Sequence, residues 1–214
     1  MYEHVIQDNA FYRVVKDVIL MRMQKVILFD FFGVICPDIG KAILMSQSRE
    51  RAHKKSMLYK LHATYTELSK RVQKSFTHGA PVPLDAVPVS QDTMGDIDCV
   101  DPEMLTLIRE LKRLGHRIGI ASNANHAWIH AILAKDDVSK LFEHIVISSS
   151  VGFIKPDERF FVKICDAFQC STDDCILVDD NAYNVESAQR FGMHGIRYTS
   201  MAKLRTELMH LGVL

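Results

Sequence analysis

Short apolar runs alternate with stretches of helical periodicity over the second half of the chain, and this alternation constrains the fold more than any other feature. Candidate strands lie at residues 117–121, 144–147, 175–178 and 195–198. Helices are expected at about residues 101–115, 126–134, 157–168 and 182–191, with one more at the C-terminus. Strands joined by such helices form a parallel sheet with right-handed crossovers, covered on both faces. The sequence therefore predicts an α/β fold.

The first strand comes much earlier in the chain. Residues 25–30, Lys-Val-Ile-Leu-Phe-Asp, form a short apolar segment that ends in a carboxylate and precedes Gly33, which is typical of a buried strand followed by a tight turn. Residues 40–76 lack strand-like alternation and are rich in helix formers. Residues 77–100 contain Gly and Pro with few periodic apolar positions, which indicates a connector that returns from an inserted module.

An insertion directly after the first strand therefore divides the chain. The predicted parts are a leader or helix at residues 1–24, a core at 25–36 and 96–214, and a helical cap with its connector at 37–95. The expected architecture is a Rossmann-like parallel sheet flanked by helices, with a small helical cap inserted after the first strand.

Composition limits the classes of partner. The 26 basic and 26 acidic residues give no net charge, so we expect no nucleic-acid partner and no attraction to an anionic membrane. No run approaches the roughly 18 apolar residues of a membrane span, and the N-terminus does not resemble a secretion signal. The five cysteines are odd in number and contain no C-x-x-C pair, which implies neither a disulfide framework nor a zinc site. A cytoplasmic location is expected.

Polar residues follow four of the predicted strands. In open parallel sheets ligands bind beyond the carboxyl ends of the strands, so these residues are the candidates for a site. They are Asp30, Ser122 with Asn123, Lys155, and Asp179 with Asp180. Together they supply carboxylates, a hydroxyl, an amide and an ammonium, which metal-assisted phosphoryl transfer requires. The alternative role for the second and fourth groups is capping of the helices that follow them.

The same residues carry a resemblance to a known family. Asp30-Phe-Phe-Gly33, Ser122-Asn123, Lys155-Pro156 and Asp179-Asp180-Asn181 resemble, in order, the four motifs of the haloacid dehalogenase-like hydrolases, over about residues 25–199. Each motif alone is common, whereas four in order, each after a predicted strand, form a specific signal. The residues around the second and fourth motifs are most similar to subfamily IA, near the sugar-phosphate phosphatases and the epoxide hydrolase N-terminal branch.

This resemblance implies a nucleophile and a metal site. Asp30 would attack phosphorus and form an aspartyl-phosphate that water then hydrolyses. Mg²⁺ would be held by the carboxylates of Asp30 and Asp180 and by the backbone carbonyl of Phe32. The predicted activity is thus a Mg²⁺-dependent phosphohydrolase.

Five further residues receive roles from the resemblance. Lys155 would lie between the nucleophile and the phosphate and offset the repulsion between carboxylates. Ser122, with the backbone amide of Asn123, would donate hydrogen bonds to the transferring phosphoryl group. Asp179 would act through a water molecule or on a neighbouring ligand, and Asn184 would hold Asp180 or Lys155.

Phe32 is the departure from the pattern that affects the expected activity. Many phosphatases of this family carry a second Asp at this position as acid and base, and its loss would slow turnover by about 10²- to 10⁴-fold. A 2-haloacid dehalogenase, which has an aromatic residue here, is the alternative enzyme. A non-catalytic phosphate-binding or regulatory protein is the alternative outside enzymes.

The expected substrate is a small phosphorylated metabolite, with sugar phosphates as the favoured class. A cap of this size encloses a small pocket and suits metabolites better than phosphoproteins. The cap itself determines specificity in this architecture, and its sequence contains no recognisable code for a substrate or for an oligomeric state. Histidines 53, 62 and 78 in or near the cap are candidates to replace the missing acid.

Overall fold

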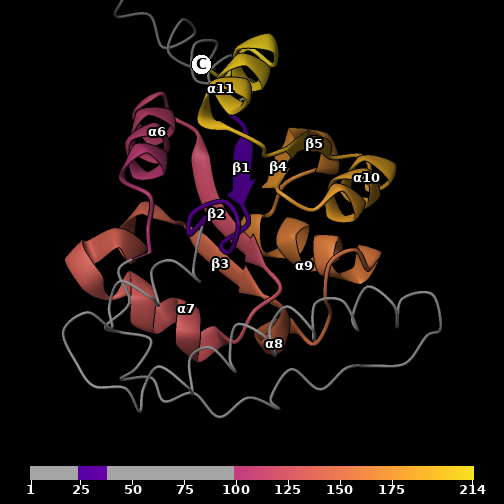
Figure 1. The fold of residues 1–214 in the computed structure, drawn as a ribbon. Helices are drawn as coiled ribbons and strands as arrows, with labels where there is room; N and C mark the ends of the chain where they lie inside the picture. Colours follow the sequence, from indigo (N-terminus) through magenta and orange to yellow (C-terminus); the bar gives the residue numbers. More distant parts are fainter. Residues whose placement is uncertain (1–23, 38–98) are drawn as a thin grey trace, which may run out of the picture.

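All four residues of β1 (Val26–Phe29) are buried. A strand that is apolar on both faces belongs in the centre of a parallel sheet. The computed structural model, which describes residues 24–37 and 99–214, places β1 there: five parallel strands lie in the order β3-β2-β1-β4-β5 (Figure 1). The other strands are β2 (Arg117–Ser122), β3 (His144–Ile147), β4 (Cys175–Asp179) and β5 (His194–Arg197).

The pairing of β1 brings together the ends of three strands. Phe29, the last residue of β1, lies opposite Ile120 of β2 and Val178 of β4. Because these strands are parallel, the residues that follow these three positions lie at one edge of the sheet. The candidate site of the sequence is assembled at this edge.

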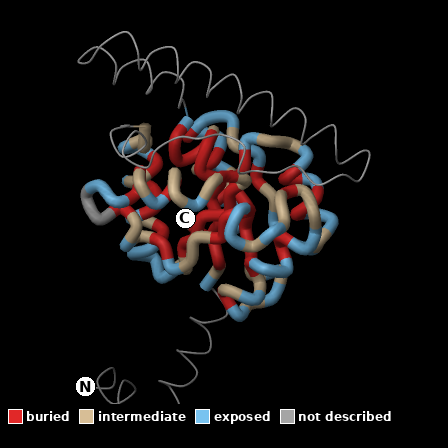
Figure 2. Tube along the Cα trace, turned by 90° about the horizontal axis from the view of Figure 1, so that it is seen from below, coloured by how far each residue is buried: buried red, intermediate tan, exposed pale blue. Residues whose placement is uncertain are grey.

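Helices cover both faces of the sheet. They are α6 (Pro102–Arg113), α7 (His126–Leu133), α8 (Ser148–Val151), α9 (Glu158–Phe168), α10 (Ala182–Phe191) and α11 (Met201–His210), with the 3₁₀ turns η1 (Lys135–Leu141) and η2 (Thr172–Asp174). Ile27 and Phe29 pack in one apolar cluster with α6, α7 and α11. Val26 and Leu28 pack in the other cluster with α9 and α10. Figure 2 shows the buried residues gathered in the interior between these layers.

Short polar side chains fix where the longer helices begin. Each accepts a hydrogen bond from a backbone N–H of the first turn, which would otherwise lack a partner. These N-caps are Asp101, Asn125, Asp157, Asn181 and Ser200. Asn125 caps α7, so Ser122 and Asn123 do not have the capping role considered for them. In the fourth motif only Asn181 is a cap.

The predicted α/β fold is confirmed. All five expected strands and the five expected helices after residue 100 are present, with ends that shift by one or two residues. The sequence did not predict η1, α8 or η2. Residues 148–150 form most of α8.

Two cysteines correct the expectation that no disulfide is present. Cys36 and Cys99 form a disulfide with a Cα–Cα distance of 5.0 Å, although 63 positions separate them in sequence. Cys36 lies just after β1 and Cys99 just before α6, so the pair joins the two points at which the predicted insertion leaves and re-enters the core. Spacing alone gave no sign of this contact.

The predicted leader and cap lie outside the described residues, as do histidines 53, 62 and 78. The division of the chain into leader, core and cap therefore stays a prediction. Among residues 24–37 and 99–214, no helix is both long and apolar enough to cross a membrane.

Candidate functional site

Three carboxylates meet at the carboxyl edge of the sheet. Asp30 follows β1, Asp179 ends β4 and Asp180 follows it, and their carboxylate oxygens lie within 4.8 Å of one another. Asp30 and Asp179 are buried, whereas Asp180 is exposed. Buried carboxylates repel one another at this separation unless cations compensate them. The group therefore has the donor chemistry of a site for a hard divalent cation.

Gly33 makes room for this group. Its φ of +92° is a conformation that residues with a Cβ rarely adopt. A Cβ at this position would also lie 2.5 Å from Oδ2 and 2.6 Å from Cγ of Asp180. Both the backbone conformation and the close approach of Asp180 thus require glycine here.

Lys155 supplies the positive charge within the group. Its side chain is completely buried, and its Nζ lies 3.2 Å from Oδ1 of Asp30 and 2.5 Å from Oδ2 of Asp179. The same ammonium donates to the backbone carbonyl of Ala121 at 2.6 Å. The ammonium therefore makes two hydrogen bonds, to Asp179 and to Ala121, and an ion pair with Asp30.

Burial and charge shift the ionisation of the site. Burial raises the pKa of Asp30 to about 7; Lys155 opposes this rise, and the charges of Asp179 and Asp180 add to it. The pKa of Asp180 is also raised: although the residue is exposed, its carboxylate is partly desolvated by the neighbouring groups, and the charge of Asp179 adds to the rise. Burial disfavours the charged ammonium of Lys155, but Asp179 and Asp30 outweigh it and raise its pKa. The three carboxylates carry more negative charge than one ammonium balances, and a bound cation would lower their pKa values.

Asp179 contacts Lys155 directly, whereas the sequence suggested a role through water or through a neighbouring ligand. Besides its ion pair with Lys155, it accepts from the backbone N–H of Asn181 at 2.9 Å. Asn184 Nδ2 donates to both of its oxygens, at 3.1 and 3.0 Å. Asn184 therefore holds Asp179, which is neither of the two partners expected for it. No pattern in the sequence indicated this contact, because it depends on how α10 packs against the end of β4.

The two residues of the second motif, Ser122 and Asn123, have different surroundings. Ser122 Oγ is buried and makes no hydrogen bond of good geometry among the residues that the structure describes, although it lies near enough to Asp30 to lower the pKa of that carboxyl slightly. Asn123 uses its side chain on the loop of the third motif: its Nδ2 donates to the carbonyl of Lys155, and its Oδ1 accepts from the N–H of Lys155, both at 2.8 Å. The sequence assigned only the backbone amide of Asn123 a role. The structure adds a clamp that fixes the backbone of Lys155.

The loop after β1 fixes the nucleophile candidate and buries Phe32. Oδ1 of Asp30 accepts from the N–H of Phe31 at 2.7 Å, and the backbone closes on itself through Cys36 N–H to the Phe31 carbonyl at 2.8 Å. Phe32 packs in the same apolar cluster as β1. Position 32 therefore offers no acid or base to a substrate.

The model of the family described as haloacid dehalogenase-like hydrolase matches residues 24–192. A sesquiterpene phosphatase of Aspergillus oryzae is 32% identical over 111 residues, which cover 52% of this chain and 57% of that protein. An (S)-2-haloacid dehalogenase of Pseudomonas putida is 28% identical over 91 residues, 42% of this chain and 41% of that protein. The match thus spans about half the length of these curated relatives.

The fold also has a close counterpart among solved structures. The putative HAD-hydrolase YfnB of Bacillus subtilis, solved bound to magnesium, superposes with a TM-score of 0.65 at 15% identity, over 88% of this chain and 99% of that one. At this identity the likeness shows the fold alone. Because the family model covers most of the chain and its motifs converge at one edge of the sheet, the protein belongs to the haloacid dehalogenase-like hydrolases.

Proposed function

We propose that this hydrolase is a Mg²⁺-dependent phosphatase that acts on a small phosphorylated metabolite through an aspartyl-phosphate. The observation that carries the proposal is the group of three carboxylates within 4.8 Å around the buried ammonium of Lys155. Sugar phosphates remain the favoured substrates. The cytoplasmic location and the lack of a nucleic-acid partner remain predictions of the sequence.

The residues present fit a hard divalent cation. Asp30 and Asp180 would hold Mg²⁺ through their carboxylates, together with the carbonyl of Phe32, and Asp179 lies beside them. When bound, the ion would offset the negative charge of the site and of the phosphate and polarise the phosphoryl oxygens.

Asp30 is the proposed nucleophile. Its carboxylate oxygen forms a bond to phosphorus while the bond from phosphorus to the leaving oxygen breaks, and water then cleaves the aspartyl-phosphate to release inorganic phosphate. The N–H of Phe31 and the ammonium of Lys155 both hold Oδ1, which fixes the orientation of the carboxylate. The Ser122 hydroxyl, which makes no hydrogen bond of good geometry within the described part of the chain, is the proposed donor to the transferring group. With Phe at position 32, substrates with good leaving groups should react fastest.

Dehalogenation is the second candidate, favoured by the dehalogenase relative and by the aromatic residue at position 32. It would use the same Asp30 on carbon. The grouped carboxylates argue against it, because the resembling dehalogenases need no cation and have no acidic pair at the fourth motif. A binding protein without activity is disfavoured, because such a role does not require a buried nucleophile held by Lys155.

The test measures phosphate release from a panel of phosphometabolites and p-nitrophenyl phosphate, with Mg²⁺ and with chelator, and halide release from 2-haloacids. Asp30→Asn removes the nucleophile with little change of shape. Asp166→Asn, the same substitution on the exposed face of α9, is the matched control. We expect Mg²⁺-dependent phosphate release that Asp30→Asn abolishes and Asp166→Asn preserves. Metal-independent halide release without phosphate release would establish the dehalogenase instead.

A further inference from the structure

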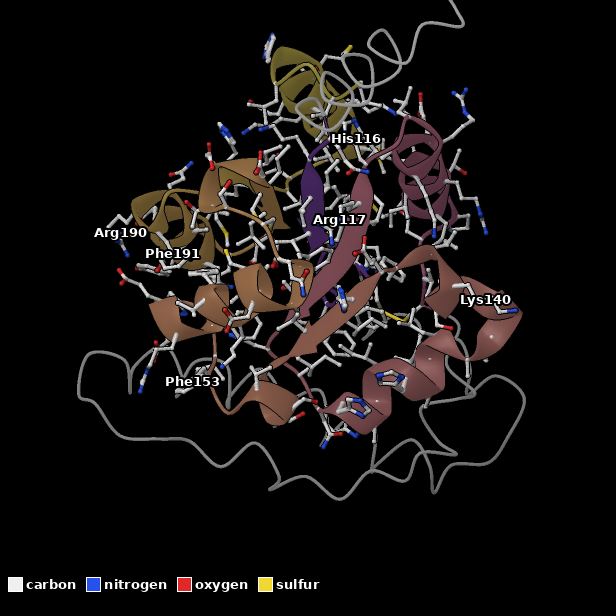
Figure 3. The ribbon with its side chains drawn as sticks, turned by 180° about the vertical axis from the view of Figure 1, so that it is seen from behind. His116, Arg117, Lys140, Phe153, Arg190 and Phe191 are labelled. Atoms are coloured by element: carbon white, nitrogen blue, oxygen red, sulfur yellow. A yellow bond between two sulfur atoms is a disulfide. The ribbon has the colours of Figure 1, made fainter. Side chains whose placement is uncertain are left out.

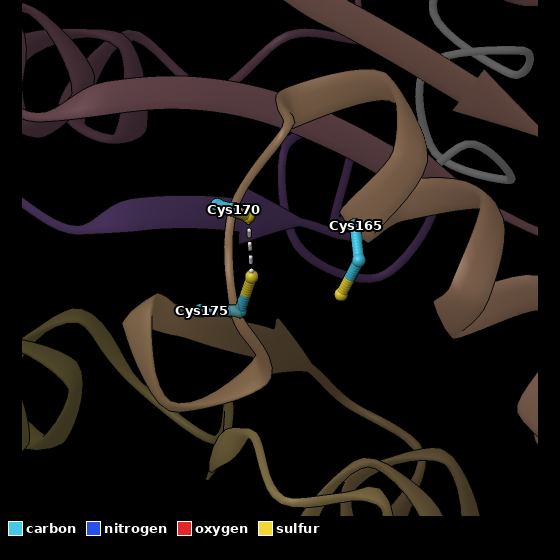
Figure 4. Close-up of side chains that lie close together, drawn as sticks. All are labelled: Cys165, Cys170 and Cys175. Carbon is cyan, nitrogen blue, oxygen red and sulfur yellow. Dashed lines mark hydrogen bonds between the residues drawn. The ribbon is translucent and has the colours of Figure 1, made fainter.

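Three thiols converge at the edge of the sheet opposite the carboxylates. Cys165 lies in the last turn of α9, Cys170 follows the end of that helix, and Cys175 begins β4 (Figure 4). Their sulfur atoms lie within 4.8 Å of one another, and Cys170 Sγ and Cys175 Sγ are 3.3 Å apart in a hydrogen bond. Because β4 runs from Cys175 to Asp179, its whole length separates this cluster from the carboxylate group.

Hydrogen bonds fix the backbone at the end of α9 and the thiol of Cys175. The carbonyl of Cys165 accepts from the N–H of Gln169 and from the N–H of Cys170, so the end of α9 turns back on itself. The Cys175 thiol donates to the carbonyl of Ser171 at 3.5 Å across the intervening turn η2. Cys175 is buried, whereas Cys165 and Cys170 are half-buried and give access from the surface. The cluster is therefore built into the fold and reachable from solvent.

The sulfur positions suit a soft metal ion. A Zn–S bond of about 2.3 Å places the sulfurs of a tetrahedral site roughly 3.8 Å apart, so the three thiols need to move by only about 1 Å or less. Thiolates select thiophilic ions, whereas the carboxylate oxygens at the other edge of the sheet select hard ones. The spacing of the three residues matches none of the common zinc motifs, which explains why the sequence did not indicate a site.

A cation lies near the cluster. Three thiolates around a divalent ion would have a net charge of −1. Arg117, labelled in Figure 3, stacks over the Phe168 ring at 5.2 Å; its pKa is raised chiefly by its hydrogen bond with Glu143, and to a smaller extent by the nearby Cys170 and Cys175. Glu143 pairs with the same guanidinium. Asp166 is the acidic neighbour of Cys165.

We propose that Cys165, Cys170 and Cys175 form a binding site for a thiophilic d¹⁰ cation such as Zn²⁺. The ion would tie the end of α9 to the start of β4 and would leave one coordination position to water. A disulfide between Cys170 and Cys175 is the competing outcome. The convergence of all three sulfur atoms favours a metal ion, because a disulfide would use only two of them. A metal ion would displace the thiol protons on binding.

The test uses the full chain, reduced and free of metal, with Cd²⁺ as a spectroscopic probe for Zn²⁺. Titration should produce ultraviolet thiolate-to-metal charge transfer that saturates at one ion per chain and is reversed by excess Zn²⁺. Loss of a ligand's supporting partner typically weakens metal binding about 10- to 100-fold, so Cys165→Ser and Cys170→Ser should each weaken it by at least about 100-fold. Both sites are half-buried, so these variants are milder than a change at Cys175.

Two controls separate this cluster from other groups. Cys36→Ser with Cys99→Ser removes the remaining cysteines, and Asp180→Asn removes a ligand of the carboxylate group; both should retain the charge-transfer band. The proposal is overturned if the wild-type chain shows no band, if the band survives in Cys165→Ser and Cys170→Ser, or if the double variant loses it. Mass spectrometry of the oxidised chain that shows a Cys170–Cys175 disulfide, together with no Cd²⁺ uptake after reduction, would establish a redox pair instead.

Discussion

Replacement of Asp30 with asparagine removes one negative charge from the carboxylate group and keeps the shape of the side chain. The ordinary pKa of 3.8 applies to Asp30 in the unfolded chain, and burial raises it to about 7 in the fold. The folded protein therefore binds this proton more tightly than the unfolded chain does. Stability that is fully present below about pH 4 is lost as the pH rises through about 7. Asparagine does not titrate, so the free energy of unfolding of the variant does not fall in this way as the pH rises.

The size of the effect follows from the shift. A change from 3.8 to about 7 corresponds to roughly 4 kcal/mol at about 1.4 kcal/mol per pKa unit. The Asp30 side chain is only 12% exposed, so solvent screening reduces this value little, and local relaxation brings the expected range to roughly 2–4 kcal/mol. For a chain of this size 1 kcal/mol moves Tm by about 2–4 °C, so Asp30→Asn should melt about 5–15 °C above wild type at pH 8 without metal.

The assay is thermal unfolding of wild type, Asp30→Asn and Asp166→Asn from pH 4.5 to 8.5, with chelator and with Mg²⁺. In chelator the two Tm curves should diverge as the pH rises, while Asp166→Asn follows wild type. Mg²⁺ should stabilise wild type but not Asp30→Asn, because the variant lacks a ligand, and so the gap should narrow. A gap that is absent at pH 8, or that does not change with pH, would refute the reasoning.

Four further substitutions test the site. Lys155→Met leaves buried carboxylates without their cation and should cost about 3–5 kcal/mol in urea unfolding at pH 7, and less at pH 5, which is below the pKa of about 7 of Asp30. Gly33→Ala should cost about 2 kcal/mol more than Gly212→Ala, which also has a positive φ but meets no atom within 4 Å, and calorimetry should show weaker Mg²⁺ binding only for Gly33→Ala. Asn184→Ala should cost about 1.5–3 kcal/mol in urea unfolding, since its hydrogen bonds go to a charged acceptor. Ser122→Ala should leave stability unchanged or raise it by up to about 1 kcal/mol while kcat/KM for phosphate release falls; equal losses of both would contradict the role of its hydroxyl.

The centre of the sheet was predictable because β1, β2 and β4 are buried over nearly their whole length. Such strands read as continuous apolar runs, and the carboxyl end of each run marks the site edge. The short elements η1, α8 and η2 were missed because none is long enough to show a helical period. The site residues could be predicted as a group because parallel pairing brings the carboxyl ends of β1, β2 and β4 together.

Contacts that depend on turn geometry could not be predicted. Asn184 reaches Asp179 because α10 starts directly after the turn that ends β4, and no spacing rule encodes that direction. The side chain of Asn123 reaches the backbone of Lys155 across 32 positions. Likewise, the pairing of Cys36 with Cys99 depends on a contact between two parts of the fold that are 63 positions apart in sequence. These contacts decide how rigidly the site is held, and only the fold reveals them.

Lys155 and Ser122 contribute in different ways to the stability of the fold and to the proposed reaction. The Lys155 ammonium donates to Ala121 and Asp179 and forms an ion pair with Asp30 at 3.2 Å, so its charge is compensated within the protein. Its effect on the reaction therefore passes through Asp30, whose orientation and charge it sets. Ser122 differs from Lys155, because its buried hydroxyl makes no hydrogen bond of good geometry among the described residues. A buried donor without a partner lowers the stability of the fold. This loss of stability is explained if the hydroxyl binds a ligand. Lys155 thus stabilises the arrangement of carboxylates, whereas Ser122 is the proposed donor to the phosphoryl oxygens.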